Sequence, residues 1–121
     1  MGLEAQPQPG VRRGGFLQRA NYRIYGKVFA WDIAKALVNF EKHGVSFEEA
    51  ATAFADLDGL DWDDSEHSSD EARRKRLGVS VTGRVLLIVY TIRRSRDDKE
   101  TTRIISARQA SRKERAAYAG S

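Results

Sequence analysis

Apolar and polar positions follow two different periods along the chain, and each period predicts one kind of element. In residues 22–29 the β-favouring side chains of Tyr, Ile, Val and Phe recur in an alternating pattern that is typical of a strand. After Asp32 apolar residues recur at i, i+3, i+4 and i+7, as on one face of an α-helix. That face consists of Ile33, Ala36, Leu37 and Phe40. We therefore predict a strand, then an amphipathic helix that has Asp32 as its N-cap and ends near Gly44, with Asn39 off its apolar face.

A second helix is expected to begin at Ser46. Ser46 and Glu49 form a capping-box pattern, in which each side chain accepts a backbone N–H of the first helical turn. Behind it the apolar residues Phe47, Ala50, Ala51 and Phe54 keep helical spacing. Because only three residues separate the two helical patterns, we expect a tight corner between two packed helices.

The second half of the chain predicts strands. Three stretches rich in β-favouring residues are separated by short polar loops, namely residues 74–81, 85–93 and 101–108. We expect them to form an antiparallel meander, with a further short strand around Leu60 and Trp62 in the acidic segment 56–71. Ser111 and Glu114 repeat the capping-box pattern and predict a short C-terminal helix.

These elements combine into an α+β fold. We predict an antiparallel sheet with the two N-terminal helices packed on one face, the other face free to bind, and the short C-terminal helix closing the chain. Strict alternation places Arg93 and Tyr90 on opposite faces of their strand. It likewise places Arg103 and Arg108 on opposite faces of the last strand.

Length and composition narrow the class of protein. The 121 residues fit one domain, and we assign residues 1–20 to a flexible N-terminal tail and residues 21–121 to that domain. The absence of cysteine excludes disulfides and thiolate chemistry and is compatible with a cytoplasmic location. No apolar stretch has the length of a membrane span or of a signal peptide, so we expect no membrane partner.

Charge is distributed very unevenly. Residues 1–43 carry a net charge of +4, residues 44–71 of −10 and residues 72–121 of +10. A basic surface of this kind attracts polyanions through phosphate contacts and counterion release, which makes RNA the natural candidate. The alternative is that Lys and Arg only keep a β-rich surface soluble.

Several short motifs keep a fixed order along the chain: Trp31-Asp32, Lys42 to Ala50, Gly83-Arg84, Val89-Tyr90-Thr91, Arg93, and Arg103 to Arg108. In this order and spacing they resemble the BrnT family of ribonuclease toxins, over about residues 29–118. The resemblance implies a RelE-like fold, an RNA-cleaving toxin that inhibits translation, and a BrnA-like antitoxin that neutralises it. Toxin and antitoxin of this family form a heterotetramer, in which the antitoxin supplies the contacts with operator DNA.

RNA cleavage without a metal needs a base near the 2′-hydroxyl, an acid near the leaving 5′-oxygen, and cations around the phosphate. His67 is our leading candidate for proton transfer, because carboxylates beside it can orient its ring. Its other interpretation is an exposed loop histidine among acidic side chains. Glu71 is the second candidate for proton transfer.

The candidates for phosphate and base contacts are mostly cations of the predicted strands. Arg93 and Arg108 are assigned to the catalytic site because the planar guanidinium donates two parallel hydrogen bonds to a phosphate. Tyr90 can stack on a base or donate a proton, or belong to the core. The RNA-binding set is Lys42, His43, Arg84 and Arg103, and His43 also suits a structural role at a helix C-terminus.

Other charged groups carry weaker signals. For the run of four cations in residues 73–76 we expect a general electrostatic role. The carboxylates of Asp61, Asp63, Asp64 and Glu66 lack the glycine and distal glutamate of a calcium loop, so we expect no metal and no cofactor. The competing class of protein is a nucleic-acid-binding module, or a degenerate toxin that keeps only antitoxin binding and operon regulation.

Overall fold

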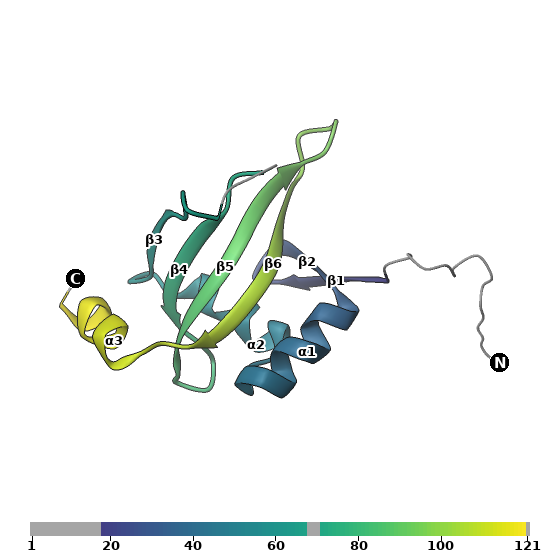
Figure 1. Ribbon diagram of the computed structural model, residues 1–121. Helices are drawn as coiled ribbons and strands as arrows, with labels where there is room; N and C mark the ends of the chain where they lie inside the picture. The colour runs from purple at the N-terminus through teal and green to yellow at the C-terminus, as the bar shows by residue number, and fades with distance from the viewer. Residues whose placement is uncertain (1–17, 68–70, 121) are drawn as a thin grey trace.

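The protein forms an α+β structure around one six-stranded sheet (Figure 1). A computed structural model describes residues 18–67 and 71–120, so most of the predicted tail lies outside the described residues. The strands are β1 (Arg19–Ile24), β2 (Lys27–Asp32), β3 (Leu60–Asp63), β4 (Arg74–Val79), β5 (Val85–Arg94) and β6 (Glu100–Gln109). The helices are α1 (Ile33–His43), α2 (Phe47–Thr52), the 3-10 turn η2 (Ala53–Ala55) and α3 (Arg112–Ala119).

The sheet is mixed, so the prediction of a purely antiparallel sheet was wrong. The strand order is β1-β2-β6-β5-β4-β3, and β2 runs parallel to β6 through Phe29↔Thr102 and Ala30↔Arg103. The other neighbouring pairs are antiparallel. Parallel strands need a long connection between them, and here the chain from α1 to β5 supplies it.

The single strand predicted for residues 22–29 is instead the middle of a hairpin between β1 and β2. Tyr25 and Gly26 both have left-handed backbones, with φ of 56° and 74°. Two left-handed residues make the type I′ turn that matches the twist of paired strands. The apolar alternation continues through this turn, which is why the sequence pattern concealed it.

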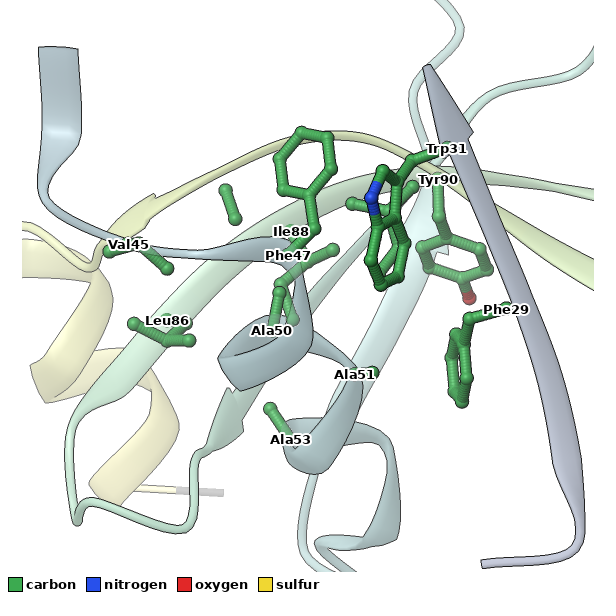
Figure 2. Packing of buried hydrophobic residues seen from close by; sticks show 12 residues of the cluster. Phe29, Trp31, Val45, Phe47, Ala50, Ala51, Ala53, Leu86, Ile88 and Tyr90 are labelled. Atoms are coloured by element: carbon green, nitrogen blue, oxygen red, sulfur yellow. The ribbon is translucent and has the colours of Figure 1, made fainter. Parts of the chain in front are cut away.

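The larger core lies between α2, β1, β2 and one face of β5 and β6 (Figure 2). Phe47, Ala50 and Ala51 of α2 are buried against Leu86 and Ile88 of β5. Contacts between aromatic rings extend the cluster. The ring centroids are 5.0 Å apart for Phe54 and Tyr90, 5.1 Å for Phe29 and Phe54, and 5.8 Å for Trp31 and Phe47. In Figure 1 α2 lies behind the sheet, and no helix crosses the middle of the front face of β4, β5 and β6.

A smaller cluster covers one end of that front face. Leu77 and Leu87 are buried there together with Ala110, and Tyr118 of α3 packs against them. We call the remainder of this face, opposite the larger core, the open face.

The helix termini mostly follow the predicted caps. The Asp32 side chain accepts the backbone N–H of Lys35 at 3.1 Å, and Gly44 ends α1 with a left-handed φ of 69°. Ser111 and Glu114 form a complete capping box. The box predicted for Ser46 is only half formed, because the Glu49 carboxylate binds side chains of the β4–β5 turn instead.

Helix α1 does not bury the face that its apolar spacing predicts. Leu37 is 66% exposed and Phe40 53% exposed, whereas Asn39 is only 7% exposed. The Asn39 side chain accepts the backbone N–H of Ala107 at 3.1 Å and donates to the carbonyls of Ala107 at 2.8 Å and Val45 at 3.0 Å. A polar side chain therefore attaches α1 to the edge of β6 beyond the point where β2 pairs with it.

A β-bulge in β6 changes which residues share a face. Val89 pairs with Ser106 and Tyr90 with Ile104, so Ile105 has no partner and is the extra residue. Ile104 and Ala107 consequently both enter the core, although they are three residues apart. Their neighbours Arg103 and Arg108 then both point to the open face, and the prediction of opposite faces was wrong.

Replacing Asn39 tests its role at the sheet edge. In Asn39→Leu the Ala107 and Val45 backbone groups lose their partners, and buried groups without partners cost about 1–3 kcal/mol each. We expect the unfolding free energy to fall by roughly 3 kcal/mol, measured by urea denaturation. Glu41→Leu, on the exposed side of the same helix, is the control. An Asn39→Leu variant as stable as that control would contradict this role.

Candidate functional site

The open face contains a pocket of about 340 Å³. It is lined by His43, Asp64, His67, Arg73, Lys75, Leu87, Val89, Ile105, Ser106, Ala107 and Arg108. The two histidines approach from opposite sides, since His43 ends α1 beside β6 and His67 follows β3 beside β4. Apolar side chains of β5 and β6 form the floor, and charged side chains form the walls.

His67 is held by a buried carboxylate. Its Nδ1 lies 3.1 Å and 3.2 Å from the two carboxylate oxygens of Asp64, and the Asp64 side chain is only 5% exposed. Burial opposes the charge of Asp64, but the hydrogen bond from His67 and the nearby Lys75 outweigh it and lower the pKa of Asp64. An ionised carboxylate can only accept, so Nδ1 carries the hydrogen and Nε2 of the neutral ring keeps its lone pair.

Backbone hydrogen bonds position this pair of side chains. The N–H of Asp64 donates to the carbonyl of Arg73 at 2.8 Å, and the N–H of His67 donates to the carbonyl of Asp64 at 3.3 Å. The turn that carries His67 is thus attached beside the start of β4. Asp64 is not adjacent to His67 in the sequence, and the i, i+3 spacing across a turn is the signal that points to it.

Three cations line the same pocket. Arg73 and Lys75 are alternate residues before and within β4, and the two-residue strand period separates them from Arg74 and Arg76 on the covered face. The run of four cations, for which we expected a general electrostatic role, is therefore divided between the two faces of β4. The third cation, Arg108, donates to both carboxylate oxygens of Glu114 at 2.8 Å and 2.9 Å. This contact lowers the pKa of Glu114 to about 2 and attaches α3 to β6.

Glu71, Arg93 and Arg103 form a second cluster, outside the lining of the pocket. Arg93 donates to the two oxygens of Glu71 at 3.1 Å and 3.2 Å, and Arg103 lies 3.9 Å from the same carboxylate. The hydrogen bond from Arg93 is the main reason that the pKa of Glu71 is lowered. Burial and the neighbouring Arg93 lower the pKa of Arg103.

Tyr90 and Arg84 lie away from the open face. Tyr90 is buried in the larger core, where its hydroxyl donates to Asp61 and accepts from Nε of Arg74 at 3.3 Å. Burial and the bond to Asp61 raise the pKa of Tyr90. Arg84 binds Glu49 and donates to the Gly44 carbonyl at 3.1 Å, so it connects the β4–β5 turn to the start of α2. Neither side chain lines the pocket.

Three carboxylates of the acidic segment pair with basic side chains. Asp61 pairs with Arg76, Asp63 with Arg74, and Asp64 with His67. Within residues 18–67 and 71–120, no three His, Cys, Asp or Glu side chains gather in the manner of a metal site. None of the helices in those residues has the length and apolarity needed to cross a membrane.

Comparison with models of protein families assigns the chain to a family. The family model for the ribonuclease toxin BrnT of type II toxin–antitoxin systems matches residues 31–114. The chain belongs to the BrnT family. Membership implies an RNA target and an antitoxin partner for this BrnT protein. No curated protein matches the sequence at a significant level.

The match covers every residue that lines the pocket of this BrnT protein, from His43 to Arg108. It leaves out β1, residues 27–30 of β2 and residues 115–119 of α3. Six of the predicted site residues do not line the pocket: Lys42, Glu71, Arg84, Tyr90, Arg93 and Arg103. Lys42 lies close by, in a groove that shares His43 with the pocket.

The Glu49–Arg84 ion pair of this BrnT protein predicts how the stability of the fold depends on pH in the acidic range. Hydrogen bonds lower the pKa of Glu49 from 4.5 to about 2, and the bond from Arg84 has the largest effect. Because the folded pKa is depressed, the carboxylate stabilises the fold above pH 4.5, and this contribution is lost as the pH falls towards 2. Glu49→Gln should lower the unfolding free energy at pH 7 by roughly 3 kcal/mol, at about 1.4 kcal/mol per pKa unit.

Urea denaturation across the pH range checks this expectation. The difference between the wild type and Glu49→Gln should shrink between pH 4.5 and 2. The exposed neighbour Glu48 supplies the matched variant, Glu48→Gln, which should show little loss at any pH. A Glu49→Gln effect that persists unchanged at pH 2 would refute the assignment.

Proposed function

We propose that this BrnT protein cleaves RNA without a metal, in the open-face pocket, with His67 as the proton-transfer residue. The observation that carries the proposal is the contact between His67 and the buried Asp64 inside a pocket walled by cations. A histidine that is oriented by a carboxylate and lines a pocket is the arrangement that general base catalysis requires.

The reaction is attack of a ribose 2′-oxygen on the adjacent phosphorus. Nε2 of His67 takes the 2′-hydroxyl proton as the new P–O bond forms, and Asp64 stabilises the resulting imidazolium. The bond from phosphorus to the 5′-oxygen breaks, and that oxygen must receive a proton. We assign this donation to His43, because it lines the same pocket from the opposite side. The products are a 2′,3′-cyclic phosphate and a free 5′-hydroxyl.

Cations stabilise the charge that builds on the phosphate. We assign Arg73 and Lys75 to the reacting phosphate, since both line the pocket beside His67. Arg108 adds a charge-assisted contact at the rim while it holds α3 through Glu114. We propose that Arg93, Arg103 and Lys42 contact the flanking backbone, where they add salt-dependent affinity. Glu71 orients the two arginines, and Tyr90 and Arg84 support the fold.

Trp62 offers a place for a nucleobase. It lies opposite Lys75 in the β3–β4 pair, so the two side chains share the open face, and the indole is 39% exposed. Base stacking on an aromatic ring tolerates many sequences and would keep a single strand beside the cations.

Membership of the family supports a proposal for the wider biology. We propose that the toxin acts in the cytoplasm, that RNA cleavage inhibits translation, and that a BrnA-like antitoxin neutralises it in a heterotetramer. Contacts with operator DNA would come from the antitoxin. The α+β architecture with helices around a sheet is compatible with kinship to RelE toxins.

Cleavage of bulk RNA in EDTA tests the proposal. His67→Ala should reduce the rate by about 10²–10⁴, the usual contribution of a positioned acid or base. Glu66→Ala, in the same turn but outside the pocket lining, is the matched control and should cleave as the wild type does. Cleavage retained by His67→Ala would reject the site, and binding without cleavage by the wild type would favour the nucleic-acid-binding module.

Asp64→Asn tests the positioning of His67. An amide presents a donor as readily as an acceptor, so the ring loses its fixed tautomer. We expect kcat to fall by about 10–10²-fold with little change in KM, because substrate binding does not use Asp64. The hydrogen-bonded Nδ1 proton of His67 should give a downfield NMR signal that the variant loses. An unchanged signal and an unchanged kcat would show that Asp64 has only a structural role.

A further inference from the structure

Helix α1 turns a row of large apolar side chains to solvent. Leu37 is 66% exposed, Val38 61% and Phe40 53%, on a helix of only 11 residues. Ala34, Leu37, Val38 and Glu41 lie at i, i+3, i+4 and i+7, so they form one continuous ridge on the outer side. Single exposed apolar residues are ordinary, but an adjacent group marks a surface that a partner covers.

An apolar groove continues this ridge towards the open face. It has a volume of about 360 Å³ and lies between α1 and β6, with Ala34, Val38 and Ile105 among its lining residues. Lys35 and Lys42 also line it, two helical turns apart. His43, Ile105 and Ser106 line both this groove and the open-face pocket. Whatever fills the groove therefore borders directly on His43.

The chemistry of this surface suits a protein helix better than RNA. The large exposed side chains of this face, Leu37, Val38 and Phe40, are aliphatic or phenyl groups, which offer nothing to a phosphate. An amphipathic helix can cover such a ridge with apolar residues at i, i+3, i+4 and i+7. The two lysines along its flank favour acidic residues at the matching positions of that helix.

We propose that the outer face of α1, together with the groove, is the docking surface for the antitoxin. The antitoxin presents an amphipathic helix whose apolar side covers Leu37, Val38 and Phe40 and whose acidic residues meet Lys35 and Lys42. One apolar side chain of that helix enters the groove and lies against Ile105. Occupied in this way, the groove leaves no path for RNA past His43, which explains inhibition without any contact with His67. This inference rests on the proposed antitoxin partner.

The double variant Leu37→Ser/Phe40→Ser tests the docking surface. Both side chains are exposed and lie outside the pocket lining, so the thermal melt and RNA cleavage should match the wild type. Affinity for the full-length cognate antitoxin, measured by titration calorimetry, should fall at least 100-fold. In the presence of antitoxin the double variant should therefore continue to cleave RNA.

The matched control removes two exposed apolar side chains elsewhere. Leu57 and Val81 are 100% and 71% exposed, and Leu57→Ser/Val81→Ser should bind antitoxin as the wild type does. Equal binding by both double variants would overturn the inference. So would a wild type that is dimeric without antitoxin and becomes monomeric in Leu37→Ser/Phe40→Ser, because a second copy would then be the occupant. If the wild type cleaves RNA but binds no antitoxin, this inference fails and the ribonuclease proposal stands.

Discussion

Where β2 stops pairing with β6, the backbone groups of β6 need other hydrogen-bond partners, and the side chain of Asn39 supplies them. Register between β2 and β6 ends at Arg103, yet β6 continues for six further residues to Gln109. The amide of Asn39 satisfies both the N–H and the carbonyl of Ala107, as a neighbouring strand would. Since an unpaired buried backbone group is costly, this contact fixes how α1 is rotated about its own axis. The rotation brings His43 to the pocket and leaves Leu37 and Phe40 in solvent.

The bulge at Ile105 decides which side chains of β6 face the site. An uninterrupted β6 would alternate faces, and Arg103 and Arg108 would lie on opposite sides of the sheet. With one extra residue, both arginines lie on the open face, and Arg108 lines the pocket there. Bulges often occur beside active sites because they redirect side chains in this way. Here the bulged residue itself lines both the pocket and the α1 groove.

Local features of the sequence predicted most elements but not their tertiary arrangement. Helix caps at Asp32 and Gly44 and the strand at Val85–Arg94 follow from side chains close in sequence, and the structure has them as expected. The pairing of β2 with β6 and the burial of Asn39 depend on residues about 70 positions apart, which no local period records. The bulge depends on the register between β5 and β6, which alternation along one strand does not record either. Apolar spacing misassigned α1 because it cannot distinguish an apolar face that is buried from one that is exposed.

The candidate site, too, was predictable only where local sequence features point to it. His67 was conspicuous as one of two histidines, but Asp64 was one carboxylate among ten in residues 44–71. Only the paired strands reveal how that acidic segment is used. Asp61 and Asp63 face the covered side and pair with Arg76 and Arg74, as the β3–β4 register dictates.

Those pairs leave the open face with a different balance of charge. Arg73 and Lys75, from the same run of four cations, face the pocket because the strand period alternates. Asp64 is the carboxylate of the acidic segment that lines this pocket, and it contacts His67. A negative charge therefore contacts an imidazole, and positive charges line the same pocket. The two-residue period of β4 thus separates the cations that stabilise the fold from those that form the pocket.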